Sequence, residues 1–423
     1  MTFLKKCKLY LFKKNKMIKV VHISTSKHGG AGIAAYRLHE ALNKSGEVES
    51  YFIHKDFNKN NSPEKTAGVP FYTPSIFFIF LIKLKLTDFP ENNKLRNYVQ
   101  QFSSKFEIAT YPESLYRIEE HPLVKEADIV HLHWVANFLN YPTFFKKIQK
   151  PIIWTLHDMN PFQGLFHYKN DEMNLEKELG NIDNKILKKK VKSIRKNSNI
   201  NIITLCNWMH DCSINSKAFR NFRHTIIPNL IDFENYPLLN REQEKRKHNL
   251  DNGLKTLMFI AQDINNKRKG FDLLLKALNL ITQKANIITV GGDKISLNSN
   301  FNHLHFKKIE HIPDLNSLYS ASDLVLLTSR EDNLPNVMLE SFANGTPVIS
   351  FKVGGMKDWI KENETGYLIQ PFSTEKLSEK ITYFLDNKNN FDSNKIYEYA
   401  KENFSIEKKL PDYIYLYKQV SAQ

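Results

Sequence analysis

Two carboxylates with seven residues between them form the pair in this 423-residue chain best placed to bind a polar ligand. Asp332 lies in a loop after the apolar run 323–327, and Glu340 lies in a helix expected to begin near Pro335. A second short apolar run, residues 347–351, follows that helix. This order predicts a strand–helix–strand unit of a buried parallel sheet. Ligands bind at the carboxyl edge of such sheets, so both acids are candidate site residues.

The ligand expected at this position carries both negative charge and hydroxyl groups. The free N–H groups and the dipole of a helix N-terminus favour phosphate, whereas two carboxylates repel it. Carboxylates instead accept hydrogen bonds from sugar hydroxyls. A nucleotide diphosphate sugar meets both requirements, with its phosphates on the amides of residues 335–337. Taken alone, such a pair is more often an ordinary loop acid and a solvated helix residue.

The segment that carries the acidic pair resembles the donor-binding signature of GT-B glycosyltransferases of family 4. That signature is E-x7-E followed by A-x-G-T-P-V, and here ANGTPVISF occupies residues 343–351. The first acid is Asp332, directly preceded by Glu331, so either one could contact the sugar. The resemblance implies that Glu340 holds the ribose. It also implies that the donor is lined by Asn333, Leu334, Pro335, Asn336 and Val337.

A loop earlier in the same half of the chain supplies positive charge. Arg268 and Lys269 stand before Gly270 and an amphipathic helix, after an apolar strand expected at residues 256–261. Cations beside a helix start are suited to bind diphosphate. The resembled family usually has an Arg a few residues earlier, near Asp263, and Arg268 is expected to replace it. A lysine-rich surface turn is the alternative interpretation.

His157 and Asp158 follow the apolar strand expected at residues 152–155. A neutral imidazole could orient a sugar hydroxyl while Asp158 accepts a hydrogen bond from one. The stretch WTLHDMNPFQG resembles a loop of a polysaccharide-assembly branch of family 4, which implies that His157 lies near the reacting sugar. His131 and His133 are two residues apart in a strand and therefore face the same side. They could in principle hold a metal, but a structural or acceptor-lining role is preferred and no metal is expected.

Glycine-rich turns follow two further expected strands. Residues 17–24 form the first strand, and GGAGIAAY after it resembles the loose dinucleotide pattern, which keeps a nicotinamide oxidoreductase open as an alternative. The family resemblance places Gly29 and Gly30 near the donor phosphates and the acceptor. It also implies that the base of the ligand approaches Gly292. The backbone at residues 353–355 is likewise expected close to a ligand.

Chain length and the alternation of strands with helices predict an α/β protein with two domains. The resemblance specifies the GT-B fold, in which two Rossmann-like domains face each other across a cleft. The expected divisions are a basic leader at 1–16, an N-terminal acceptor-side domain at 17–235, a nucleotide-sugar-binding domain at 236–405, and a helix at 406–423 that crosses back.

Composition restricts the partners and the compartment. The formal net charge of +15 predicts anionic partners, although the short lysine clusters also suit solvated helix faces. Three cysteines without C-x-x-C spacing support neither a disulfide framework nor a zinc site, so a reducing cytoplasm is expected. The apolar stretch 75–82 falls short of the ~20 residues of a membrane span. Docking of that stretch or of the basic leader at an anionic membrane surface stays open beside a buried helix and a disordered leader.

Five motifs stand in the order of the resembled family: GGAG, LHWV, TLHD, RKG and the acidic-pair helix. Together they imply retaining, metal-independent transfer of a hexose from a UDP- or GDP-linked sugar, without a cofactor. The implied acceptor is a glycan or lipid-linked sugar in cell-surface polysaccharide synthesis, at the cytoplasmic side of the membrane. A nucleotide-sugar epimerase on the same fold is the main alternative. A nucleic-acid binder would need basic residues interleaved with exposed aromatics, which this alternation does not provide.

Overall fold

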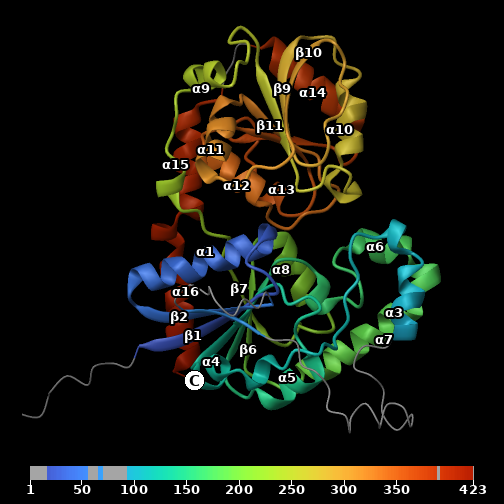
Figure 1. The fold of residues 1–423 in the computed structure, drawn as a ribbon, viewed down its shortest axis with the longest axis vertical. Coiled ribbons are helices and arrows are strands. Elements are labelled where there is room, and N and C mark those ends of the chain that lie inside the picture. The colour runs from blue at the N-terminus through green and yellow to red at the C-terminus, as the bar shows by residue number, and fades with distance from the viewer. Residues whose placement is uncertain (1–16, 56–64, 70–92, 388–390, 423) are drawn as a thin grey trace, which may run out of the picture.

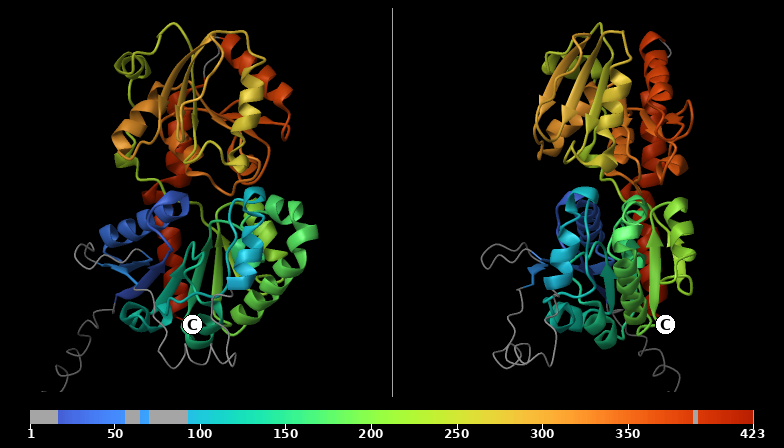
Figure 2. Two further views of the ribbon diagram at one scale, coloured as in Figure 1. Left: turned by 45° about the vertical axis from the view of Figure 1, so that its right-hand side comes forward. Right: turned by 90° about the vertical axis from the view of Figure 1, so that its right-hand side faces the viewer.

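The computed structural model describes residues 17–55, 65–69, 93–387 and 391–422. The basic leader and the apolar stretch 75–82 lie outside the described residues, so the expectations for them stay predictions. The described chain forms two α/β domains, one above the other in Figure 1, each built on a parallel sheet with helices on both faces. Figure 2 shows the same two domains from two further sides. The predicted α/β class with two parallel sheets is confirmed.

The N-terminal sheet has seven parallel strands in the order β3-β2-β1-β4-β5-β6-β7. Most of its residues are buried, because helices cover both faces. The strands are β1 (Ile18–Ile23), β2 (Val48–His54), β3 (Thr66–Gly68), β4 (Ile129–Leu132), β5 (Ile152–Leu156), β6 (Ile200–Thr204) and β7 (Arg223–Ile226).

Helices connect these strands and carry several of the predicted site loops. Gly29 opens α1 at φ 72°, a left-handed conformation that glycine adopts without strain. Gly32 packs so closely on the backbone of Ser26 that a side chain there would collide with it. The helices are α1 (Gly29–Ser45), α3 (Asn93–Gln100), α4 (Pro122–Glu126), α5 (Tyr141–Lys147), α6 (Lys169–Asn174), α7 (Glu176–Ile194) and α8 (Asn207–Ile214).

The C-terminal sheet has six parallel strands in the order β10-β9-β8-β11-β12-β13. Its strands are β8 (Thr256–Ile260), β9 (Ala285–Val290), β10 (Phe301–Phe306), β11 (Leu324–Leu327), β12 (Val348–Phe351) and β13 (Gly366–Ile369). Its helices are α9 (Arg241–Lys247), α10 (Phe271–Leu278), α11 (Ile312–Ala321), α12 (Asn336–Ala343), α13 (Met356–Trp359), α14 (Thr374–Asp386) and α15 (Ser393–Phe404).

The last helix, α16 (Ile406–Ser421), packs on the N-terminal domain. Figure 1 shows it in red beside the strands of the lower sheet. Tyr413 and Tyr417 are buried there in one apolar cluster with Val20 and Leu38. The chain therefore passes between the domains twice. The two crossings are hydrogen-bonded to each other, since Ile231 N–H donates to the carbonyl of Phe404 and accepts at its own carbonyl from Ile406.

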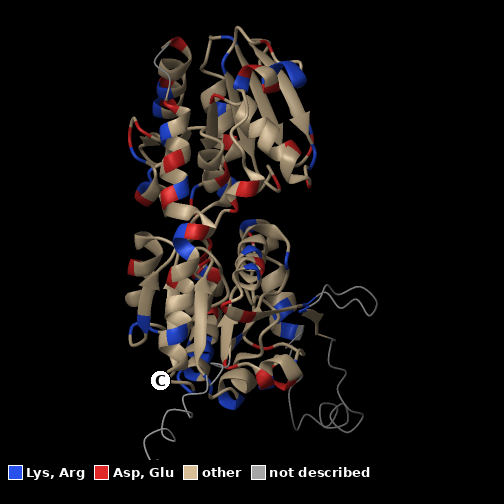
Figure 3. Ribbon diagram, turned by 90° about the vertical axis from the view of Figure 1, so that its left-hand side faces the viewer, with Lys and Arg blue, Asp and Glu red and all other residues tan. Residues whose placement is uncertain are grey.

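Charged residues are spread over both domains. In the view of Figure 3, basic and acidic positions alternate along the helices of each domain, without one face of a single sign. Across the described ranges, none of the helices combines the length and the apolar character needed to cross a bilayer.

Candidate active site

The loops that carry the predicted site residues meet where the two domains touch. Asn336, at the start of α12, donates a hydrogen bond from Nδ2 to the carbonyl of Gly30 in α1, at 3.0 Å. Asn333 Nδ2 donates to the carbonyl of Leu156, the last residue of β5, at 2.8 Å. In Figure 1 the ends of α12 and α13 accordingly lie directly above α1 and α8. Carboxyl ends of strands from both sheets thus contribute to one site.

Asp332 is bound by the two cations of the Arg268–Lys269 loop. Lys269 Nζ lies 2.7 Å from Asp332 Oδ2, and Arg268 Nη1 lies 3.3 Å from the same oxygen. Ser329 Oγ adds a hydrogen bond at 3.3 Å. Burial alone would raise the pKa of Asp332, but the charges of Lys269 and Arg268 lower it below its usual range. Asp332 is therefore a carboxylate in this site, and the cations that could hold a diphosphate are adjacent to it.

Glu331 points the other way, into the N-terminal domain. Its two carboxylate oxygens accept the backbone N–H groups of Lys169 and Asn170, each at 3.1 Å, at the start of α6. Burial raises the pKa of Glu331, and these two hydrogen bonds partly oppose the rise. Of the two neighbouring acids, Asp332 is thus the one beside the cations, and Glu331 joins the two domains.

The guanidinium of Arg268 is already bound by several protein groups and is not left free for a phosphate. Its Nη1 donates to the carbonyl of Glu331 at 3.1 Å, and Nε and Nη2 both bind the carboxylate of Glu107. Its guanidinium also lies 4.0 Å from the ring centroid of Tyr168, a cation–π contact. Glu107 and Tyr168 belong to the N-terminal domain, so Arg268 is a further connection across the junction.

Glu340 lies in the second turn of α12 and is 9% exposed. The hydroxyl of Tyr319 donates to its Oε2 at 3.1 Å. Burial raises the pKa of Glu340, while Arg37 of α1, across the junction, acts in the opposite direction. The carboxylate thus retains hydrogen-bonding capacity for a ligand hydroxyl. Leu334, Pro335 and Val337 flank this segment, and Leu334 is part of the C-terminal core rather than an open surface.

Asp158 is enclosed by hydrogen-bond donors. Its Oδ2 accepts from Trp134 Nε1 at 2.7 Å and lies 2.5 Å from His167 Nδ1, while its Oδ1 accepts the N–H of Asn160 at 3.0 Å. Burial would raise the pKa of Asp158, and His167 and the other donors lower it instead. These three contacts leave one lone pair of Oδ1 for a further donor, so the expected contact with a sugar hydroxyl stays a prediction. In this arrangement Asp158 braces the loop that presents His157.

His157 is half-buried, and its Nε2 lies 3.2 Å from Nδ1 of His133. Burial lowers the pKa of His157 to about 4, with Asp158 opposing the shift, so the imidazole is neutral near pH 7. Its backbone carbonyl accepts from Asn333 Nδ2 at 3.3 Å. The acidic-pair loop and the His157 loop, 176 residues apart in sequence, are therefore in direct contact.

The glycine turns approach protein backbone. Side chains at Gly354 and Gly355 would collide with the carbonyls of Asp332 and Asn333, so this turn supports the acidic-pair loop. A side chain at Gly292 would press on Ile264. Gly30 instead has room, since a Cβ added there would lie 3.8 Å from Asn336 Nδ2. Gly30 and Gly355 both lie at the junction of the domains, since Gly30 faces Asn336 and Gly355 faces the sulfur of Cys206.

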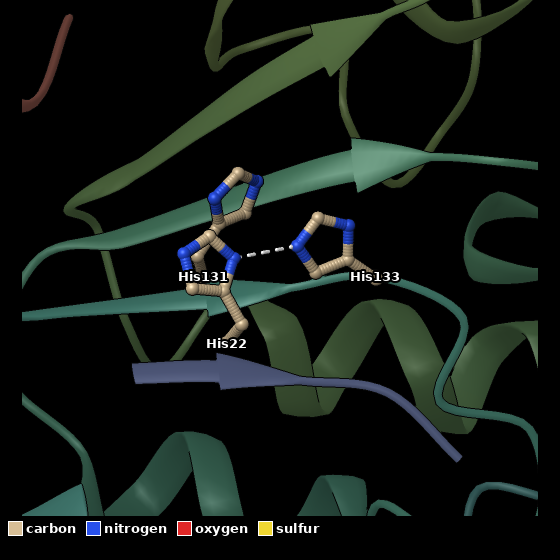
Figure 4. A group of neighbouring side chains, drawn as sticks. All are labelled: His22, His131 and His133. Atoms are coloured by element: carbon tan, nitrogen blue, oxygen red, sulfur yellow. Dashed lines mark hydrogen bonds between the residues drawn. The ribbon is translucent and has the colours of Figure 1, made fainter. Parts of the chain in front are cut away.

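Three histidines form the one group, within the ranges that the structure describes, whose ligand atoms lie close enough together for a metal ion. They are His22 of β1, His131 of the adjacent β4, and His133 directly after β4 (Figure 4). The rings of His131 and His133 are stacked, with centroids 4.2 Å apart and planes at 28°. Stacked rings direct their nitrogen lone pairs side by side rather than toward one centre. The four nitrogens of His131 and His133 also all have hydrogen-bond partners already, so the cluster is not arranged as a metal centre.

The space near His157 is small. A cavity of about 10 Å³ is lined by His157 together with His133, Trp134 and Asp158, among others. Sites for ligands of drug size occupy roughly 300–1,000 Å³. A larger hollow of about 540 Å³ lies along α7 and contains none of the predicted site residues.

Several residues of this site were not found by sequence reasoning. Glu107 and Tyr168 bind Arg268, and Arg37 and Tyr319 act on Glu340. None of them stands in a recognisable motif. The alternation of His131 and His133 in one strand was a visible signal, but their partner His22 lies 111 residues from His133.

Known proteins resemble part of this chain in sequence. Residues 240–403 match the family model described as "Glycosyl transferases group 1". CapM of Staphylococcus aureus, a capsular polysaccharide biosynthesis glycosyltransferase, is 25% identical over 166 residues, covering 36% of this chain and 42% of CapM. A D-inositol 3-phosphate glycosyltransferase of Corynebacterium glutamicum is 34% identical over 73 residues, covering 17% of this chain and 18% of that protein. The chain thus spans less than half the length of these relatives.

Solved structures match over nearly the whole chain. Sucrose-phosphate synthase from Thermosynechococcus elongatus superimposes with a TM-score of 0.67 at 16% identity, covering 96% of this chain and 99% of that one. HepE from Anabaena, solved in complex with UDP-glucose, superimposes with a TM-score of 0.61 at 15% identity, covering 96% and 100%. These similarities concern the fold. The architecture is that of GT-B glycosyltransferases, as predicted from the sequence.

Proposed function

We propose that this protein is a glycosyltransferase that moves a sugar from a nucleotide diphosphate sugar to a glycan or lipid-linked acceptor. The observation that carries the proposal is the group formed by Asp332, Lys269 and Arg268 at the start of α12, with Glu340 in the same helix. It combines cations for a diphosphate with carboxylates for hydroxyl groups. The match of residues 240–403 to group 1 glycosyltransferases supports this assignment.

The protein's main task in such a transfer is electrostatic. As the bond from the sugar to the diphosphate breaks, negative charge grows on the departing phosphate and positive charge on the sugar. Lys269 and Arg268 would hold the phosphate, Glu340 the ribose hydroxyls, and Asp332 a hydroxyl of the transferred sugar. Because side chains provide the cations, the proposed reaction needs neither a metal nor a cofactor.

The finer features of the reaction are also proposals. The resemblance to family 4 supports retention of configuration at the transferred sugar, and the UDP-glucose in complex with HepE favours a UDP-linked donor. The name of CapM supports an acceptor in surface polysaccharide synthesis on the cytoplasmic side of the membrane. An epimerase on the same fold would use the same diphosphate site but would convert the donor without an acceptor.

Ligand-induced stabilisation tests the proposal directly. UDP-, GDP- and ADP-linked sugars are compared with NAD(H) by thermal shift, since a ligand that binds the folded state raises the midpoint. At least one nucleotide sugar should stabilise the wild type, and the shift should fall sharply in Lys269→Met. Stabilisation by NAD(H) alone would overturn the assignment. Release of free UDP with sugar transfer, rather than an epimerised donor, separates the two remaining activities, and repeating the assay with chelator tests metal independence.

A further inference from the structure

We propose that His22 and His133 position His157 as a neutral imidazole whose Nδ1 carries the proton and donates to an oxygen of the bound ligand. The proposal rests on the proposed function for the identity of that ligand, a sugar bearing hydroxyl groups. The positioning itself is a property of the free protein.

The three imidazoles form a hydrogen-bonded chain across the N-terminal sheet. His22 Nδ1 lies 3.0 Å from His133 Nε2, the contact drawn in Figure 4, and His133 Nδ1 lies 3.2 Å from His157 Nε2. His22 comes from β1 and His133 directly follows β4, its neighbour in the sheet. Both are almost completely buried, at 0% and 2% exposure. This series of hydrogen-bonded histidines therefore runs from the protein interior to the half-buried His157 at the domain junction.

All three rings are uncharged near neutral pH. Burial is the largest cause that lowers the pKa of His22 and of His133, and neighbouring histidines lower both further. The pKa of His157 is about 4, again mainly because of burial. A neutral imidazole has one N–H and one bare nitrogen. Each ring thus donates at one end and accepts at the other, so all the hydrogen bonds of the chain point in one direction.

His22, at the inner end of this histidine series, decides the direction of the hydrogen bonds. His22 Nε2 is buried without a hydrogen-bond partner among the described residues. If the bonds ran from His157 inward, this nitrogen would carry a buried N–H with no acceptor. If they run outward, it is a bare acceptor. Buried unpaired donors are rarer in folded proteins than unpaired acceptors, which favours the outward direction.

In the outward direction His22 Nδ1–H donates to His133, and His133 Nδ1–H donates to Nε2 of His157. The remaining proton of His157 is then on Nδ1. That atom makes no hydrogen bond within the described part of the chain, and it is absent from the buried unpaired atoms, so solvent or a ligand can reach it. His157 is therefore a hydrogen-bond donor to a ligand oxygen, and not a base, because its only bare nitrogen is occupied.

His131 offers an internal comparison. It stacks on His133, but its own nitrogens bind the hydroxyl of Tyr417 at 2.7 Å and Thr155 Oγ1 at 2.8 Å. His131 therefore belongs to the same histidine cluster but takes no part in the hydrogen bonds that link His22, His133 and His157. A change at His131 alters the packing around His133 and leaves the hydrogen bonds from His22 to His157 in place.

The protonation of the rings is tested by ¹⁵N NMR of the histidine side chains in the ligand-free protein, with signals assigned through single variants. We expect the proton of His157 on Nδ1 at neutral pH in the wild type and in His131→Gln. A proton on Nε2 of His157 would overturn the proposal. This measurement needs no substrate, so it is independent of whether the proposed activity is correct.

The positioning effect is tested by a matched pair at His22. His22→Gln keeps an N–H donor for His133, whereas His22→Leu removes it. We expect His22→Leu to give a mixture of protonation forms at His157 and about a ten-fold loss in kcat with little change in KM, and His22→Gln to retain most of the activity. Equal losses in both variants, with an unchanged spectrum of His157, would show that His22 acts through packing alone.

Discussion

Arg268 and Glu107 form a two-point ion pair between the two domains, with Nε to Oε2 at 2.5 Å and Nη2 to Oε1 at 3.0 Å. The guanidinium is thereby held by an N-terminal acid at the position where the C-terminal domain would meet the diphosphate of a donor. Glu107 and a phosphate compete for the same planar set of N–H groups. If Arg268 binds the diphosphate as proposed, donor binding would therefore compete with this contact between the domains.

Removing the charge of Glu107 should strengthen donor binding. In Glu107→Gln the guanidinium of Arg268 is released from its competitor, and we expect nucleotide-sugar affinity to rise about three- to ten-fold, on the order of 1 kcal/mol. Isothermal titration with the nucleotide sugar that stabilises the wild type measures this. Glu178→Gln is the control, because Glu178 pairs with Lys105 rather than with Arg268. Weaker binding in Glu107→Gln would mean that Glu107 orients Arg268 for the donor.

Replacing Lys269 should weaken donor binding. Its ammonium lies 2.7 Å from Asp332, and its loss removes a cation from the phosphate site while leaving that carboxylate less well neutralised. We expect Lys269→Met to raise the Kd for the nucleotide sugar about ten- to hundred-fold, roughly 1.4–3 kcal/mol. The neighbouring Lys267 is exposed, so Lys267→Met should bind like the wild type. Equal affinities in the two variants would exclude Lys269 from the site.

The elements that hold the site followed from local pattern. The apolar runs 323–327 and 347–351 predicted β11 and β12, which span Leu324–Leu327 and Val348–Phe351. The expected first strand, residues 17–24, agrees with β1 at Ile18–Ile23. Buried parallel strands have near-continuous apolar sequences, and this signal depends only on neighbouring residues.

The partners of the site residues could not be predicted in the same way. Glu107 is 161 residues from Arg268, and Glu331 is 162 residues from the amide of Lys169. Such contacts depend on how two finished domains dock, which no short sequence pattern encodes. Within the C-terminal domain, the glycine at 355 indicated close approach of backbone to a ligand, and the structure has the carbonyl of Asn333 there.

Variants of Glu340 and Tyr319 distinguish a role of Glu340 in ligand binding from a role in supporting the protein structure. If Glu340 binds the ribose, Glu340→Gln should weaken nucleotide binding about ten-fold or more, while Tyr319→Phe, which removes only the hydroxyl 3.1 Å from Oε2, should change affinity far less. Calorimetric titration of both variants with UDP, beside their melting temperatures, makes the comparison. Equal effects of the two variants, on stability rather than affinity, would assign Glu340 to the support of Tyr319.

The buried histidines should make the N-terminal domain sensitive to mild acid. Burial lowers the pKa of His131 to about 3 and that of His39 to about 4, and His22, His133 and His157 are lowered as well. Between the unfolded value of about 6.5 and these lower values, the unfolded chain binds more protons than the folded one. Stability is therefore complete above about pH 6.5 and is lost as the pH falls below it.

Each such histidine makes the free energy of unfolding depend on pH with a slope approaching about 1.4 kcal/mol per pH unit. Urea unfolding of the wild type and of His131→Gln between about pH 7.5 and pH 5 should show the variant with the shallower dependence, by about that amount. Glutamine can keep the contacts of His131 with Tyr417 and Thr155 and carries no titrating proton in this range. Identical slopes in wild type and His131→Gln would mean that His131 binds as many protons in the folded protein as in the unfolded one. The acid sensitivity would then come from the other four histidines or from other groups.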